Sequence, residues 1–152
     1  MGLVVLPSIL AAPAARFRAG GHAVDISPTN FPVLVNAMFT ERSATGVVDR
    51  LFAKALALDD GQTRIALCVV DTCLMPRELI DRAKEMAVQA TGLPTDRMCV
   101  SATHTHSAPS AMACLGSRVD PDYAAALPAW IAAAPTRLAM TGPRETKYSH
   151  YS

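Results

Sequence analysis

The sequence predicts an α/β fold, a mixed β-sheet with an antiparallel hairpin and a βαβ crossover. Two apolar runs, 51–58 and 64–70, are separated by Asp-Asp-Gly, and a D-G pair between such runs is a strong hairpin signal. Residues 76–91 carry apolar positions at helical spacing, and a short apolar run follows at 97–103. A strand–helix–strand unit of this length predicts that the strands 64–70 and 97–103 are parallel neighbours.

The other elements are predicted from weaker patterns. Residues 21–27 read as a strand that enters a turn at Pro28, and 29–46 as a long loop without a period. The run 65–70 is apolar at odd and even positions alike, which favours a strand covered on both faces. The last helix is expected over 123–131. Pro128 falls inside it and Pro135 is expected to end it.

The helix at 76–91 has clear ends. Pro76 suits the first helical position, and Gly92 followed by Pro94 matches the usual stop.

The chain has 152 residues, of which 51% are hydrophobic and 18% charged, with a net charge of +1. This composition predicts one domain that buries roughly 70% of the surface of its unfolded chain. Without a basic stripe, nucleic acid is not an expected partner, and no apolar run predicts a stable membrane span.

The two ends of the chain differ from its centre. Residues 2–12 are almost wholly apolar and precede Ala12-Pro13-Ala14, which is typical of a secretory signal and predicts a secreted or periplasmic protein. No Lys or Arg precedes Leu3, so a buried strand is the alternative for residues 1–14. The domain is expected over 15–140. The polar residues 141–152 predict an unstructured tail and a chain that lacks the C-terminal part of its own domain. Such a chain is expected to leave an apolar sheet face or edge uncovered and to be poorly soluble or to self-associate.

The four cysteines show no metal-binding spacing. Cys68, Cys73, Cys99 and Cys114 form no C-x-x-C pair. Cys68 and Cys99 stand in apolar runs, where a free cysteine behaves as a small buried hydrophobe. The sequence assigns no disulfide, although an exported protein would allow one.

A histidine pair stands at the end of the 97–103 run. His104 and His106 are two residues apart, so on a helix they would diverge, whereas on an extended backbone they point to the same side. The carboxyl end of a strand is where open α/β sheets place ligands. Neutral imidazoles are good zinc ligands, so the pair predicts a Zn²⁺ site. Two structural histidines bonded to carbonyls are the alternative.

The chain also resembles a known family. The segments that carry the resemblance are VDISP at 24–28, TGVVDRL at 45–51, ALALDDG at 55–61, ALCVVD at 66–71 and VSATHTHSAP at 100–109. They resemble the N-terminal domain of the neutral/alkaline non-lysosomal ceramidases, over about residues 21–127. The resemblance implies a zinc-dependent amidohydrolase that cleaves the N-acyl amide bond of ceramide-type lipids, so that the partner is a lipid amide or related small-molecule substrate.

The resemblance also assigns roles to residues. His104 is similar to the family's metal ligand, and His106 to the adjacent catalytic histidine that assists the metal-bound water. The family completes its metal site with a further His, a Glu and a Tyr from much later in the chain, so this chain alone is expected to be inactive. Asp71 ends the neighbouring strand and Ser107 follows the pair. Both are candidates to support the site by hydrogen bonds.

Two other functions are compatible with the same motif. Metal-dependent hydrolases of the amidohydrolase type also use H-x-H, but they carry the pair on a first strand, and here three predicted strands precede it. A non-catalytic binding or scaffold domain would need the histidines only for structure.

Overall fold

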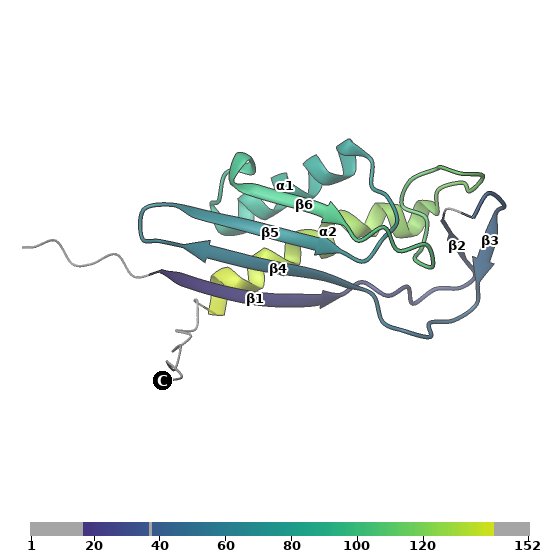
Figure 1. Ribbon diagram of the computed structural model, residues 1–152, viewed down its shortest axis with the longest axis horizontal. Helices are drawn as coiled ribbons and strands as arrows, with labels where there is room; N and C mark the ends of the chain where they lie inside the picture. Colours follow the sequence, from purple (N-terminus) through teal and green to yellow (C-terminus); the bar gives the residue numbers. More distant parts are fainter. Residues whose placement is uncertain (1–16, 37, 142–152) are drawn as a thin grey trace, which may run out of the picture.

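The computed structural model describes residues 17–36 and 38–141, which form a four-stranded sheet backed by two helices (Figure 1). The sheet order is β1 (Arg18–Asp25), β4 (Phe52–Asp59), β5 (Arg64–Val70) and β6 (Met98–Ala102). The first three strands pair antiparallel and β5 pairs with β6 in parallel. The predicted mixed α/β sheet is therefore confirmed. The predicted signal at 1–14 and nearly all of the predicted tail lie outside the described residues.

The βαβ unit forms as the sequence predicts. Helix α1 (Arg77–Thr91) begins directly after Pro76 and ends at Gly92, whose φ of 68° is in the left-handed region that glycine adopts freely. A three-residue 3₁₀ turn (Thr95–Arg97) leads into β6. In the parallel register Val70 faces Ala102. Strands β5 and β6 therefore end together, and the segments that follow them share one edge of the sheet.

Helix α2 (Pro121–Thr141) is longer than predicted, and the expectation that Pro135 ends it is wrong. Both Pro128 and Pro135 lie inside the helix. An internal proline removes one backbone hydrogen bond and crowds the preceding turn. Tertiary packing offsets this cost, because Leu127 and Ile131 are fully buried against the sheet.

The region predicted as a loop over 29–46 contains a small second sheet. Strands β2 (Val33–Val35) and β3 (Arg42–Ala44) pair antiparallel. Three residues are too few to give a readable alternation of apolar and polar side chains, so the prediction missed them. This hairpin lies beyond the carboxyl ends of β5 and β6 (Figure 1).

The core lies on one face of the four-stranded sheet. Both helices pack on the face formed by residues such as Ala55, Cys68 and Val70. On the opposite face Leu56, Leu67 and Val69 are 40%, 39% and 41% exposed. The expectation that β5 is covered on both faces is therefore wrong. The expected uncovered apolar face is present, and self-association through it stays a prediction. Within the described part of the chain, every helix is too short or too polar to cross a membrane.

Candidate metal centre

The two predicted histidines lie in the loop after β6, not on the strand itself. The strand ends at Ala102 instead of Thr103. Two backbone hydrogen bonds extend the contact with the chain that leaves β5. Thr103 donates its N–H to the carbonyl of Val70 at 3.0 Å, and Thr105 donates to that of Thr72 at 3.1 Å. These bonds hold His104 beside the segment that follows β5.

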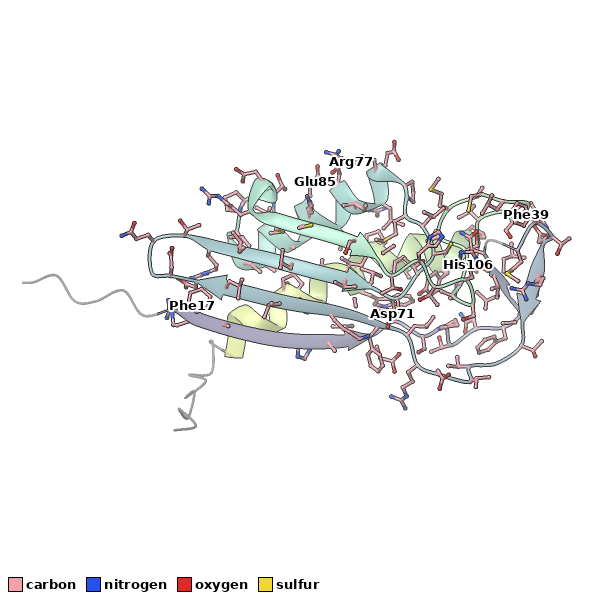
Figure 2. The ribbon with its side chains drawn as sticks, viewed as in Figure 1. Phe17, Phe39, Asp71, Arg77, Glu85 and His106 are labelled. Atoms are coloured by element: carbon pink, nitrogen blue, oxygen red, sulfur yellow. The ribbon has the colours of Figure 1, made fainter. Side chains whose placement is uncertain are left out.

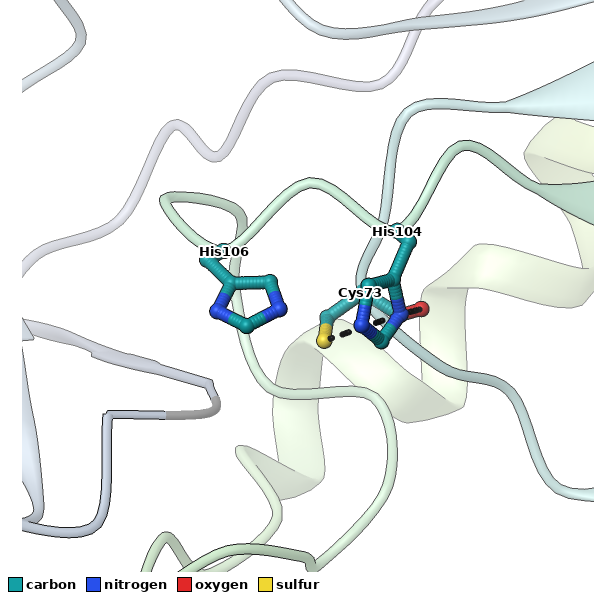
Figure 3. Close-up of side chains that lie close together, drawn as sticks. All are labelled: Cys73, His104 and His106. Carbon is teal, nitrogen blue, oxygen red and sulfur yellow. Dashed lines mark hydrogen bonds between the residues drawn. The ribbon is translucent and has the colours of Figure 1, made fainter.

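The backbone at His104 is not extended, so the predicted reason for the pairing of the rings is wrong. His104 has a φ of 65°, in the left-handed region that non-glycine residues seldom occupy. The rings nevertheless lie side by side, as predicted. Their centroids are 4.6 Å apart and their planes meet at 75° (Figure 3). The loop conformation, instead of strand alternation, brings the imidazoles together.

Cys73 is the third member of the cluster. Nδ1 of His104 lies 3.2 Å from the backbone oxygen of Cys73 and 3.8 Å from its Sγ. The potential ligand atoms of Cys73, His104 and His106 all lie within 4.8 Å of one another (Figure 3). Cys73 was not among the predicted site residues, because the spacing of the four cysteines to one another forms no metal-binding pattern. Its place three residues after β5, beside the strand that precedes the histidines, was the available signal.

The surroundings of the three groups differ. Cys73 is fully buried, whereas neither imidazole is buried. Burial raises the pKa of the Cys73 thiol, and the nearby Cys114 thiol raises it further. None of the four cysteines forms a disulfide. Cys68 is buried as expected, whereas Cys99 is exposed, so its expected burial is wrong. Zn²⁺ binds the neutral imidazole and the deprotonated cysteine thiolate, and the raised pKa of Cys73 favours the protonated thiol instead.

Asp71 and Ser107 lie at the same end of the sheet without contacting the rings by a hydrogen bond in the described structure. The Asp71 carboxylate accepts hydrogen bonds from the backbone N–H of Phe52 at 3.0 Å and from Nζ of Lys54 at 3.1 Å. It therefore joins β5 to β4, while Figure 2 shows Asp71 and His106 beyond the same strand ends. That Asp71 or the exposed Ser107 orients an imidazole stays a prediction.

A groove of about 560 Å³ opens beside the loop that carries the two histidines, residues 103–120, here called the histidine loop. Thr105 and Ser107, which flank His106 in the chain, form part of its wall together with Asp71. Much of the remaining lining is aliphatic and comes from the β2–β3 hairpin and the segment before β4: Val33, Val35, Val47, Val48 and Leu51. The volume is within the usual range for small-molecule pockets, which are mostly apolar with a few polar groups.

The far end of the histidine loop is anchored by Asp120. Its Oδ2 accepts a hydrogen bond from the N–H of Leu34, and its Oδ1 accepts one from the N–H of Tyr123, both at 3.0 Å. Its own N–H donates to the carbonyl of Ser110 at 2.8 Å, and Ser110 donates its N–H to Leu34 at 2.7 Å. One carboxylate thus ties the loop to β2 and to the start of α2.

Comparisons with known proteins agree with this architecture. No family model matches the chain. Neutral ceramidase of Drosophila pseudoobscura pseudoobscura is 30% identical over 117 residues, which cover 72% of this chain and 16% of that protein. The fold matches the crystal structure of neutral ceramidase from Pseudomonas aeruginosa with a TM-score of 0.68 at 18% identity, over 80% of this chain and 21% of the other. A ceramidase complexed with C2 matches with a TM-score of 0.62 at 17% identity, over 78% and 20%.

These matches concern a limited part of the larger proteins, since the chain spans 16% of the length of the curated relative. Within that part, the sequence match and the shared fold point to the same family as the motifs at 24–28, 45–51, 55–61, 66–71 and 100–109. Over the part that it matches, the chain is therefore ceramidase-like, similar to a neutral ceramidase in sequence and to two solved ceramidases in fold.

Proposed function

We propose that this chain provides part of the active site of a zinc-dependent hydrolase that cleaves the N-acyl amide bond of ceramide-type lipids. The observation that carries the proposal is the pair of imidazoles in the loop at the carboxyl end of β6, whose ring centroids are 4.6 Å apart. The match to a protein named neutral ceramidase supports the amide substrate. The aliphatic groove beside the pair supports a lipid, because an acyl chain would be removed from water there.

The cluster offers suitable ligands for the metal that the family implies. His104 would bind Zn²⁺, and its Nδ1 lies within hydrogen-bond distance of the Cys73 carbonyl, the contact that commonly fixes the orientation of a metal-binding histidine. When bound, zinc supplies a Lewis acid for the amide carbonyl and lowers the pKa of bound water.

His106 would move the proton. It accepts a proton at a ring nitrogen from the water whose oxygen forms the new bond to the acyl carbon. As the C–N bond breaks, it returns that proton to the amine nitrogen, so the products are a fatty acid and a sphingoid base. The ring is not buried, so it exchanges protons with solvent between turnovers.

The fold discriminates between the competing functions. The described residues form an open mixed sheet with two antiparallel pairings, which does not match the parallel barrel of amidohydrolase-type enzymes. In a scaffold domain the histidines would be purely structural. A measurement of zinc binding distinguishes that function from a metal-dependent hydrolase. Export from the cell is part of the proposal, and the mass of the recovered protein tests whether residues 1–14 are removed.

The test is a calorimetric zinc titration of the chain with a matched pair of variants. His104→Ala is expected to weaken zinc binding at least about tenfold, because it removes a ligand. His22→Ala is the control, since His22 lies on β1, the edge strand opposite β6. Equal zinc affinity of the wild type and His104→Ala would contradict the metal site. Hydrolysis of a fluorescent ceramide by the longest natural form of the protein, lost in His106→Ala, tests the substrate.

A further inference from the structure

Large apolar side chains are exposed around the groove and at the turn of the β2–β3 hairpin. Phe39 is 78% exposed and Val48 is 98% exposed. Val48 lines the groove, whereas Phe39 lies in the turn that joins β2 to β3, at the end of the molecule beyond His106 (Figure 2). Single exposed apolar residues are common, but a group of them marks an interaction surface. We call this group the apolar rim, and it comprises Met38, Phe39, Val47, Val48 and Leu115.

The backbone of Phe39 is held in a conformation that its residue type seldom adopts. Its φ of 60° lies in the left-handed region. The turn at 114–117 packs directly against it, since a Cβ atom added to Gly116 would lie 2.5 Å from the carbonyl oxygen of Phe39. Two hydrogen bonds from the Arg118 guanidinium to Glu41, at 2.8 and 2.6 Å, join the same two segments. The fold therefore tolerates backbone strain to hold an aromatic ring in solvent, which indicates a function for that ring.

The charged side chains around the apolar rim balance one another. Most of them form ion pairs: Glu41 with Arg118, Asp25 with Arg50 and Asp71 with Lys54. Arg42 and Asp49, which carry opposite charges, both line the groove. The apolar rim therefore lies in surroundings without a net charge that would attract an acidic or a basic partner. A neutral apolar surface matches a zwitterionic lipid layer better than an anionic one.

We propose that the apolar rim inserts into the surface of a zwitterionic lipid layer. The choice of occupant follows from the continuity of the rim with the aliphatic groove, because Val47 and Val48 belong to both. The proposal rests on the proposed function in one respect, that the groove takes a lipid. Such a lipid is held in a membrane or a micelle, since its chains avoid water. Apolar side chains that reach this layer beside the groove let the lipid enter without crossing water.

Sedimentation with phosphatidylcholine vesicles, without zinc or a lipid amide, tests the proposal on this chain and on the longest natural form of the protein. The variant is Phe39→Asn combined with Val48→Thr, because asparagine tolerates the left-handed backbone and threonine keeps the shape of valine. We expect its partition coefficient to fall at least about tenfold below that of the wild type, since two apolar side chains no longer leave water. Val69→Thr is the matched control, because it makes the same chemical change on the uncovered sheet face. It should bind as the wild type does, and added salt should not weaken binding.

The other outcomes overturn the proposal. Equal partition of the wild type and the double variant excludes the rim, and binding that requires anionic lipid or disappears in salt excludes a zwitterionic partner. Binding by this chain but not by the longest natural form shows that another part of that protein covers the rim. A dimer that forms without vesicles and is lost in the double variant shows that a second copy covers it.

A second measurement decides if the double variant fails to fold. Trp130 is the only tryptophan of the chain, so Phe39→Trp in a Trp130→Phe background places the sole indole on the apolar rim. Quenching of its fluorescence by brominated phosphatidylcholine supports insertion, and unquenched fluorescence on sedimented vesicles refutes it. Because neither assay contains zinc or a lipid amide, failure here overturns the rim and leaves the proposed hydrolase site to its own zinc titration.

Discussion

Removal of the Asp120 carboxylate should destabilise the fold and release the histidine loop. In Asp120→Ala the N-terminus of α2 loses the acceptor of the Tyr123 N–H, which costs about 1 kcal/mol. The N–H of Leu34 loses its partner in a half-buried position, which costs about 1–3 kcal/mol more. The expected decrease in the free energy of unfolding is therefore about 2–4 kcal/mol.

Urea denaturation followed by circular dichroism measures this change, and the melting temperature should fall by roughly 5–15 °C for a chain of this size. Asp120→Asn keeps one carbonyl acceptor and should lose about half as much. Asp122→Ala is the matched control, because Asp122 is an exposed acidic residue in the first turn of the same helix. A free energy of unfolding within about 0.5 kcal/mol of the wild type in Asp120→Ala would refute the reasoning.

Two further predictions concern the core and the acid sensitivity of the fold. Leu127→Ala should lower the free energy of unfolding by about 2–5 kcal/mol, because Leu127 is fully buried. Leu56→Ala on the uncovered face should lower it by less than about 1 kcal/mol. Equal urea midpoints of the two variants would contradict this expectation. Hydrogen bonds from Arg118 lower the pKa of Glu41 from 4.5 to about 2. Because the folded-state pKa is the lower one, the stabilisation is present above pH 4.5 and is lost as the pH falls towards 2. Glu41→Gln should therefore be less stable than the wild type at neutral pH and equally stable near pH 2, and a difference in melting temperature that does not vary with pH would rule this out.

Local sequence signals were sufficient to predict the central unit. The D-G turn, the helical period of residues 76–91, Gly92 and the apolar run at 97–103 each act within a few neighbours, and they predicted β4, β5, α1 and β6 to within one or two residues at each end. The continuation of α2 beyond residue 131 and through Pro135 could not be predicted in this way, because it depends on burial against strands far away in the sequence.

The candidate site was predictable only in part. The proximity of His104 and His106 was predicted, but from an extended backbone that His104 does not adopt. The left-handed conformation of His104 could not be predicted, because few non-glycine residues adopt it and no local pattern marks the position. Cys73 was missed because its relation to His104 is created by the parallel register of β5 and β6. A sequence pattern does not contain that register until the pairing of the strands is known.

The left-handed backbone at His104 has a consequence for protein engineering. A side chain in this conformation costs about 1–2 kcal/mol relative to glycine, which adopts it freely. A library selected for thermal resistance alone would therefore enrich glycine at position 104. The most thermostable variants from such a selection would lack the imidazole. A screen for thermostable variants therefore also needs to select for the proposed metal binding.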